Sequence, residues 1–192
     1  MNLPNKLTLA RIVLVPFFAA AMLIDFPLHH LAALALFGAA SITDMLDGQI
    51  ARKRGLITDF GKFADPLADK ILVLAALLCF VQGGLCDCVA VIIVLFREFT
   101  VTSIRLIAAS KGKVIAANMW GKVKTVTQIT AIVAILVLQS VLDLSAFGVA
   151  FPDFITPLFT AIGEALIWIS NIFVIISGVV YVVQNRGFIS EK

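Results

Sequence analysis

The feature that most constrains the fold is a series of six long apolar stretches separated by short connections. They lie at residues 7–26, 31–52, 64–84, 89–109, 119–142 and 160–184. Each is close to the roughly 20 residues that an α-helix needs to cross a bilayer. A helix satisfies its own backbone hydrogen bonds in lipid, so helices are the expected spanning structure. Only 14% of the 192 residues are charged, against roughly 25% in a soluble domain.

We therefore expect an all-α integral membrane protein with six transmembrane helices. No internal repeat or linker divides the chain, so residues 1–192 are expected to form one domain. Lys6 and Arg11 lie at the start of the first stretch, ahead of three consecutive alanines, as in a secretory signal peptide. Removing it would leave an odd number of helices, so we expect it to remain as the first span.

The positions of Lys and Arg predict the orientation. The connections near 26–30, 83–88 and 143–159 contain no Lys or Arg, whereas the basic residues gather at the other ends of the stretches. The positive-inside rule then places both termini in the cytoplasm. The net charge of +3 follows from this bias and also favours contact with anionic lipids.

Cysteine and histidine do not suggest catalysis. Cys79, Cys86 and Cys88 lack the second ligand pair of a structural zinc site, and we interpret them as small side chains near an interface. His29 and His30 lie at the predicted outer face. A nucleophilic triad needs a base close to its nucleophile, so this chemistry is not expected.

Four aspartates interrupt the second and third apolar stretches: Asp44, Asp47, Asp65 and Asp69. Spacings of three and four residues place each pair on one face of its helix. We expect a tight turn at Gly55 to bring the two helices together as an antiparallel hairpin. Converging carboxylates would neutralise one another by protonation unless cations were present. Two divalent ions balance four negative charges, and an all-oxygen ligand set favours Mg²⁺ or Mn²⁺.

The aspartates have two other interpretations. Asp65, which precedes Pro66, could cap the third helix, but capping does not explain Asp44 and Asp47 in mid-span. A divalent-cation transporter would place carboxylates at the midplane of two related halves. Here the acids occupy one pair of neighbouring stretches in a chain without a repeat, which favours a two-metal site for displacement at phosphorus.

The residues between the aspartates carry a resemblance. The pattern D-x2-D-G-x2-A-R-x8-G-x3-D-x3-D runs from Asp44 to Asp69 and resembles, at each of its fixed positions, the motif of the CDP-alcohol phosphotransferase family. Further segments resemble bacterial members of that family: the opening Asn2-Leu3-Pro4-Asn5-Lys6-Leu7-Thr8, Arg97-Glu98-Phe99 with Arg105, and Gly121-Lys122-Val123-Lys124-Thr125.

The resemblance implies a six-helix enzyme of the bacterial cytoplasmic membrane, with its site open to the cytoplasm. Asp44, Asp47, Asp65 and Asp69 would hold two metal ions, and Asp69 would be the general base. The residues implied in binding the CDP group are Asp44, Gly48, Ala51, Arg52 and Gly61. An acceptor hydroxyl would attack the lipid-side phosphorus of CDP-diacylglycerol and release CMP.

The acceptor alcohol is indicated by a second, cationic set of residues: Arg97, Arg105, Lys122 and Lys124. Arg97 and Arg105 are eight residues apart and lie on one side of their helix. An internal salt bridge of Arg97 with Glu98, Asp59 or an aspartate of the motif, and snorkelling of the lysines, stay open as alternatives. So many cations favour a phosphorylated acceptor, and with the resemblance they favour sn-glycerol 3-phosphate. Inositol phosphate, phosphatidylglycerol and serine remain alternatives.

Two expectations concern partners. Membrane lipids are expected around the helices, and no nucleic acid is expected as a partner. A stripe of small residues at Gly163, Ser170, Ser177 and Gly178 is typical either of packing within the chain or of a homodimer face.

Overall fold

Helices make up nearly all of the chain that the computed structural model describes, which is residues 3–54, 59–113, 115 and 118–189. The side chains at 3–4, 44–54, 59–66, 69 and 189 lie outside this description. The elements are α1 (Leu3–Leu23), α2 (His29–Arg54), α3 (Asp59–Gln82), α4 (Cys88–Ser110), α5 (Met119–Leu142), the short 3₁₀ helix η1 (Asp143–Phe147), α6 (Ile155–Gln184) and α7 (Arg186–Ile189). The prediction of an all-α protein is confirmed.

The long helices α1 to α6 correspond to the six predicted stretches, with the largest differences at three N-terminal ends. α1 begins at Leu3, α3 at Asp59 and α6 at Ile155, which is four, five and five residues earlier than the apolar pattern predicts. Pro4 and Pro157 lie in the first turns of α1 and α6. Proline is tolerated there because the first backbone N–H groups of a helix have no partner within it.

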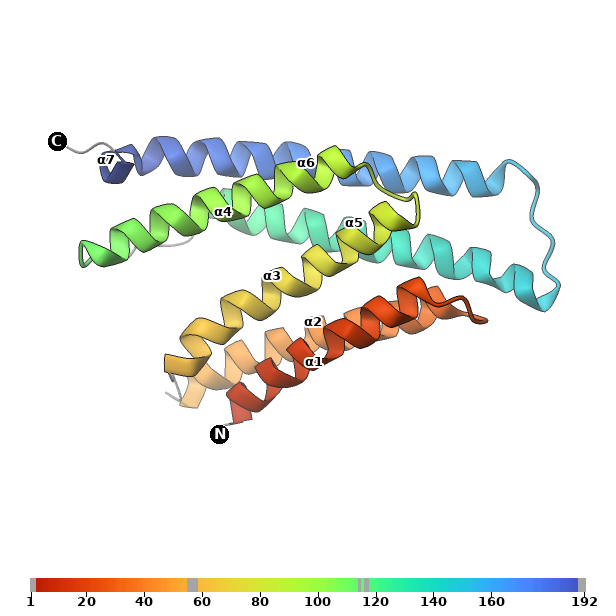
Figure 1. Cartoon of the computed structure of the whole chain (residues 1–192), viewed down its shortest axis with the longest axis horizontal. Helices are drawn as coiled ribbons and strands as arrows, with labels where there is room; N and C mark the ends of the chain where they lie inside the picture. Colours follow the sequence, from red (N-terminus) through yellow and green to blue (C-terminus); the bar gives the residue numbers. More distant parts are fainter. Residues whose placement is uncertain (1–2, 55–58, 114, 116–117, 190–192) are drawn as a thin grey trace.

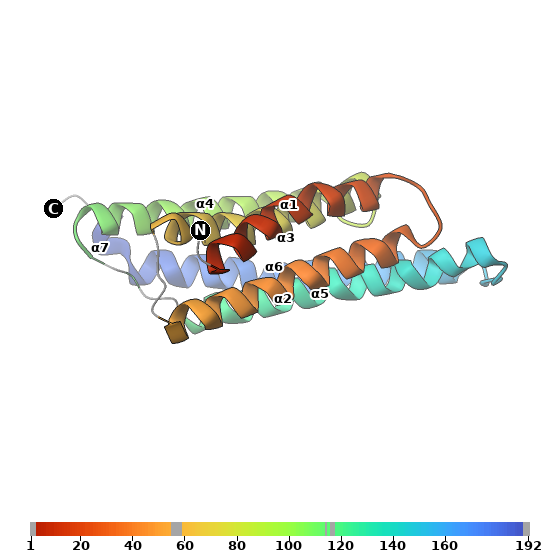
Figure 2. The same ribbon diagram turned by 90° about the horizontal axis from the view of Figure 1, so that it is seen from below.

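Successive long helices run in opposite directions (Figure 1). The α1–α2, α3–α4 and α5–α6 connections lie at one end of the bundle, and the start of α1 and the end of α6 lie at the other (Figures 1 and 2). α1 packs against both α2 and α3, while α6 packs against α5 and α4. The helices that carry the aspartates therefore share α1 as a neighbour.

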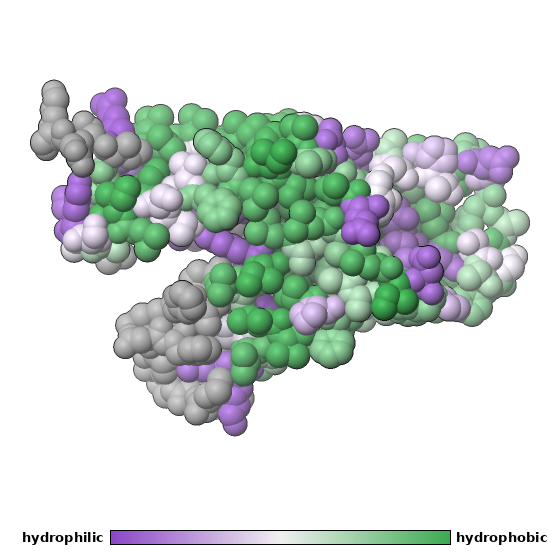
Figure 3. Space-filling view, in the orientation of Figure 1, coloured by the Kyte–Doolittle hydropathy of each residue, from purple (hydrophilic) through white to green (hydrophobic). Residues whose placement is uncertain are grey.

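The interior is apolar, and so is much of the outer surface. Phe18 on α1 packs on Phe37 of α2, with ring centroids 5.9 Å apart, and both side chains are fully buried. Hydrophobic side chains also cover most of the visible face along α4 and α6 (Figure 3). On α6 the large exposed side chains recur on one face: Ile169, Ile172, Ile175, Val179 and Val183. An apolar outer face of this length is typical of a helix in contact with lipid.

Three segments among the described residues are long and apolar enough to cross a membrane: Asn5–Leu23, Met119–Phe147 and Ile155–Gln184. His29–Thr43 and Lys70–Gln82 are shorter apolar helical segments. The chain is thus a membrane protein with helical spans.

The small-residue stripe of α6 faces the inside of the bundle. Ser170 and Ser177 are buried, and a methyl group added at Gly163 would lie 3.0 Å from Ile135 Cγ1 on α5. A methyl group added at Gly178 would lie 3.1 Å from Arg97 Cγ on α4. The stripe therefore provides close packing within the chain, the first of the two interpretations above.

Candidate active site

The aspartate motif is carried by α2 and α3. The backbone of α2 includes Asp44, Asp47, Gly48, Ala51 and Arg52, and that of α3 includes Gly61, Asp65 and Asp69. The helical spacing on which the pairing of the carboxylates was based is therefore present. Their side chains, the turn at Gly55 and the convergence of the four carboxylates lie outside the described residues, so the metal site stays a prediction.

α1 adds a polar face that the sequence reasoning did not identify. Asn5, Thr8 and Arg11 recur every three residues and are buried, Thr8 and Arg11 completely. Each of the three has an interaction partner. A buried guanidinium is stable only where it is paired and hydrogen-bonded. The recurrence of polar residues every three positions in an otherwise apolar helix is the sequence signal that could have identified this face. The face lies on a helix that packs against both helices of the motif.

Of the four predicted cationic residues, Arg97 and Lys124 lie together, and both donate hydrogen bonds to one carboxylate. Arg97 Nη1 and Lys124 Nζ donate to the same oxygen, Glu98 Oε1, at 2.8 and 2.7 Å. Lys70 Nζ lies 3.8 Å from Glu98 Oε2. We call Lys70, Arg97, Glu98 and Lys124 the Glu98 cluster. It joins α3, α4 and α5 and carries a net positive charge.

The cluster is shielded from solvent, and one of its members adjoins the aspartate motif in sequence. The exposed fraction is 12% for the side chains of Arg97 and Glu98, 9% for Lys124 and 34% for Lys70. Coulomb interactions are stronger there than at a fully hydrated surface. Lys70 directly follows Asp69 in α3, and it also donates to Thr102 Oγ1 on α4. The alternative of an internal Arg97–Glu98 salt bridge is thus correct as a contact, and the cluster retains excess positive charge.

The first turn of α5 lies beside the same guanidinium. Asn118 caps this helix by accepting from the backbone N–H of Gly121 at 2.8 Å. A methyl group added at Gly121 would lie 3.8 Å from Arg97 Nη2, the nitrogen that donates to Ser177 Oγ at 2.6 Å. A helix N-terminus attracts anions through its free N–H groups and its dipole. Arg97, Lys124 and the start of α5 therefore bring three favourable features for an anion together.

The other two predicted cations occupy different surroundings. Arg105 contacts α6, where its Nε donates to Tyr181 Oη at 3.2 Å. Arg97 contacts the same helix through Ser177, which agrees with the prediction that both arginines lie on one side of α4. Lys122 is exposed on α5 and lies outside the Glu98 cluster. Lys70, Ser177 and Tyr181 were missed as site residues, because their relation to Glu98, Arg97 or Arg105 depends on how separate helices pack. Glu98 was considered only as a salt-bridge partner of Arg97.

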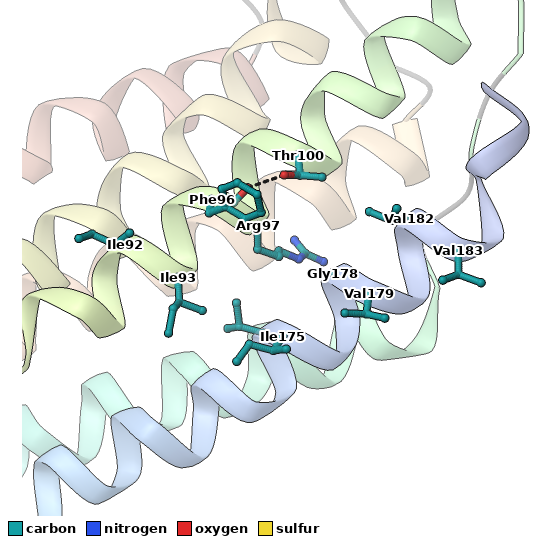
Figure 4. A pocket seen from close by; sticks show the side chains of 11 residues that line it. Ile92, Ile93, Phe96, Arg97, Thr100, Ile175, Gly178, Val179, Val182 and Val183 are labelled. Atoms are coloured by element: carbon teal, nitrogen blue, oxygen red, sulfur yellow. Dashed lines mark hydrogen bonds between the residues drawn. The ribbon is translucent and has the colours of Figure 1, made fainter. Parts of the chain in front are cut away.

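An apolar pocket of about 500 Å³ lies next to Arg97, between α4 and α6 (Figure 4). Its lining includes Ile92, Phe96, Val174, Val179 and Val183, with Thr100 and Arg97 as the polar members. The apolar lining suits a hydrocarbon chain better than a polar ligand.

Comparison with known proteins decides the family. A sequence model of the CDP-alcohol phosphatidyltransferase family matches residues 1–176. The chain belongs to this family. The CDP-alcohol phosphatidyltransferase match confirms the resemblance that the aspartate motif indicated, and with it the chain's identity as a phosphatidyltransferase enzyme.

Individual relatives match two thirds or more of the chain. It is 44% identical to the CDP-diacylglycerol–glycerol-3-phosphate 3-phosphatidyltransferase of Bacillus subtilis, over 96% of this chain and 95% of that one. It is 36% identical to the protein of the same name from Rickettsia felis, over 94% and 93% of the two chains. The protein of that name from Haemophilus influenzae is 38% identical over 68% of this chain and 73% of its own.

Proposed function

We propose that this CDP-alcohol phosphatidyltransferase transfers the phosphatidyl group of CDP-diacylglycerol to sn-glycerol 3-phosphate, forming phosphatidylglycerol phosphate and CMP. The observation that carries the proposal is the 44% identity with the Bacillus subtilis protein over 96% of the chain. The net positive Glu98 cluster supports it, because an anionic acceptor gains from Arg97 and Lys124 whereas a neutral alcohol gains little.

The aspartates are assigned to the metals and to the nucleotide. Asp44, Asp47, Asp65 and Asp69 would hold two divalent cations, Mg²⁺ or Mn²⁺; their all-oxygen donors, carried on two helical backbones, fit these ions. The bound cations would neutralise the pyrophosphate and the charge that develops at phosphorus. Gly48, Ala51 and Gly61 would leave room for the cytidine, and Arg52 would bind a phosphate.

The chain's own residues would act as follows. Arg97 and Lys124, with Arg105 and the exposed Lys122 further out, would bind the acceptor phosphate. Asp69 would take the proton of the acceptor hydroxyl while the hydroxyl oxygen forms a bond to the lipid-side phosphorus. At the same time, the bond between that phosphorus and the departing CMP would break. A carboxylate is too weak a base to ionise an alcohol in advance, so proton transfer accompanies attack. The neighbouring Lys70, paired with Glu98, would link the acceptor end of the site to the metal end.

The placement in the membrane is part of the proposal. We infer that α1 to α6 all span the bacterial cytoplasmic membrane, with both termini and the aspartates on the cytoplasmic side and residues 1–192 acting as one catalytic unit. Three helical connections at one end, free of Lys and Arg, support this orientation. A homodimer remains a prediction. The small-residue stripe of α6 packs within the chain and so does not provide the surface for a dimer contact.

An acceptor panel tests the function. Purified protein in detergent with CDP-diacylglycerol and Mg²⁺ should release CMP only when sn-glycerol 3-phosphate is added. Inositol phosphate, phosphatidylglycerol and serine serve as the alternative acceptors. CMP release with one of these, and none with sn-glycerol 3-phosphate, would replace the proposed acceptor while leaving the family chemistry in place.

A further inference from the structure

Two histidines and an aspartate meet at the end of the bundle away from the aspartate motif. His29 and His30 begin α2, and Asp143 lies where α5 passes into η1. Figure 2 shows the start of α2 and the end of α5 at the same end of the molecule. Asp44 is 14 residues beyond His30, or about 20 Å along the helix. This group is therefore separate from the proposed catalytic site.

The three side chains offer ligand atoms at close range. His30 Nδ1 is hydrogen-bonded to Asp143 Oδ1 at 2.8 Å, so a metal ion would replace the Nδ1 proton in this contact, and His29 Nε2 lies 3.7 Å from the same oxygen. One ligand atom from each residue can be chosen so that all three lie within 4.8 Å of one another. Bonds of about 2.0–2.2 Å to one Zn²⁺ ion place ligand atoms roughly 3.3–3.5 Å apart. Small side-chain adjustments would bring the three atoms to that spacing.

The hydrogen bond between His29 Nδ1 and a backbone carbonyl leaves His29 Nε2 available to bind a cation. His29 Nδ1 is 3.3 Å from the carbonyl oxygen of Ala21. A carbonyl only accepts, so Nδ1 carries the proton, and in the neutral ring Nε2 presents a lone pair. That lone pair lies 3.7 Å from a carboxylate oxygen, which also has only lone pairs to offer. The arrangement is repulsive unless a metal cation lies between the two atoms or Nε2 also carries a proton.

The carboxylate is also held ready. Asp143 Oδ2 accepts the backbone N–H of His30 at 3.0 Å, which fixes the group and leaves Oδ1 directed at both imidazoles. The exposed fraction is 17% for the His29 side chain, 15% for His30 and 9% for Asp143. Backbone hydrogen bonds that hold metal ligands in place are typical of real sites. The site is thus partly buried, with ligands from two segments 113 residues apart.

We propose that His29, His30 and Asp143 bind one Zn²⁺ ion, which fastens the α1–α2 connection to the end of α5. Two imidazoles and one carboxylate select Zn²⁺ over the Mg²⁺ that suits the all-oxygen motif. Three protein ligands leave one tetrahedral position for water. The proposal concerns a site other than the catalytic one and does not rest on the proposed reaction.

Metal titration of the purified full-length protein tests the site. Co²⁺ serves as the probe, with Mg²⁺ in excess to occupy the aspartate motif. We expect one Co²⁺ ion per chain with the visible absorption of a tetrahedral site, displaced by one equivalent of Zn²⁺. The signal should persist in Asp44→Asn/Asp69→Asn, which disables the motif. Zn²⁺ should also raise the midpoint of thermal unfolding.

Variants separate ligation from helix capping. Asp143→Asn keeps an acceptor for the His30 backbone N–H but loses the anionic ligand, and we expect it and His29→Gln each to weaken Zn²⁺ binding by at least about tenfold. Asp153→Asn, an exposed aspartate in the α5–α6 connection, should bind as the parent does. Equal Co²⁺ binding by parent, Asp143→Asn and His29→Gln would overturn the proposal. The proposal would also be overturned if the variants changed the midpoint of thermal unfolding but Zn²⁺ never did. His29 would then be a protonated partner of Asp143 and not a metal ligand.

Discussion

Lys124 on α5 donates a 2.7 Å hydrogen bond to Glu98 on α4, and both side chains are largely shielded from solvent. Arg97 donates to the same Glu98 oxygen, so one carboxylate fixes two cations that we assign to the acceptor phosphate. The bond between α4 and α5 therefore has two measurable consequences, one for stability and one for substrate binding.

Glu98→Gln should destabilise the protein and make its stability depend on the acceptor. Removing one partner of a buried ion pair leaves an uncompensated charge, at a cost on the order of 3 kcal/mol. We expect a lower thermal midpoint in detergent, partly restored by saturating sn-glycerol 3-phosphate. Glu164→Gln on α6, an exposed position, is the matched control. Equal thermal midpoints for both variants would show that the cluster does not stabilise the bundle.

Lys124→Met should raise the KM for sn-glycerol 3-phosphate by more than about tenfold, because a charge-assisted hydrogen bond is worth roughly 1.5–3 kcal/mol. The KM for CDP-diacylglycerol should change little. Lys122→Met should have a smaller effect since Lys122 is exposed, and Lys111→Met, at the end of α4, is the control. A similar rise in both KM values for Lys124→Met would indicate general damage to the fold instead of acceptor binding.

Asp69→Asn should retain binding of CDP-diacylglycerol but lose CMP release, because the amide cannot take the hydroxyl proton. EDTA should abolish turnover of the parent enzyme, and Mg²⁺ or Mn²⁺ should restore it. Asp153→Asn again provides the control. Near-normal CMP release by Asp69→Asn would show that Asp69 is not the general base. The EDTA result would still decide whether the reaction requires a metal ion.

Asn171→Ala should lower the free energy of unfolding by about 1 kcal/mol, the net value of a typical buried hydrogen bond. Asn171 Nδ2 on α6 donates to the carbonyl oxygen of Ala90 on α4 at 3.1 Å, and both residues are buried. Ser170→Ala is the control, since Ser170 Oγ donates only within its own helix, to Ile167. If the two variants unfold alike, the bond between α6 and α4 contributes no more than a local one.

The Cys86 thiol should react slowly with alkylating reagents at neutral pH. Burial, followed by the negative charges of Asp87 and Glu164, raises its pKa from 9.0 to about 11. A raised pKa favours the thiol over the reactive thiolate, so the alkylation rate should rise about tenfold per pH unit up to about pH 11. The measurement uses Cys79→Ser/Cys88→Ser, which keeps Cys86 alone, with the exposed Cys88 alone for comparison. A rate that levels off by pH 9 would contradict the shift.

The sequence by itself determined the helices, the membrane class and the family. Apolar length and helical periodicity are local properties, so the bounds of α5 are predicted to the residue and those of α2 to within two residues. The helical spacing of Asp44 with Asp47, and of Asp65 with Asp69, likewise depends only on the chain between them. The fixed residues of the motif were enough to predict the family that comparison then confirmed.

Only the tertiary structure decided which helix faces meet. Glu98 gathers Lys70, Arg97 and Lys124 from three helices, and Asp143 joins His30 across 113 residues. The direction of the α6 stripe was open for the same reason, since small residues suit packing within a chain and between chains equally. Such contacts depend on the rotation and crossing of helices packed through side chains far apart in sequence, which no local pattern specifies.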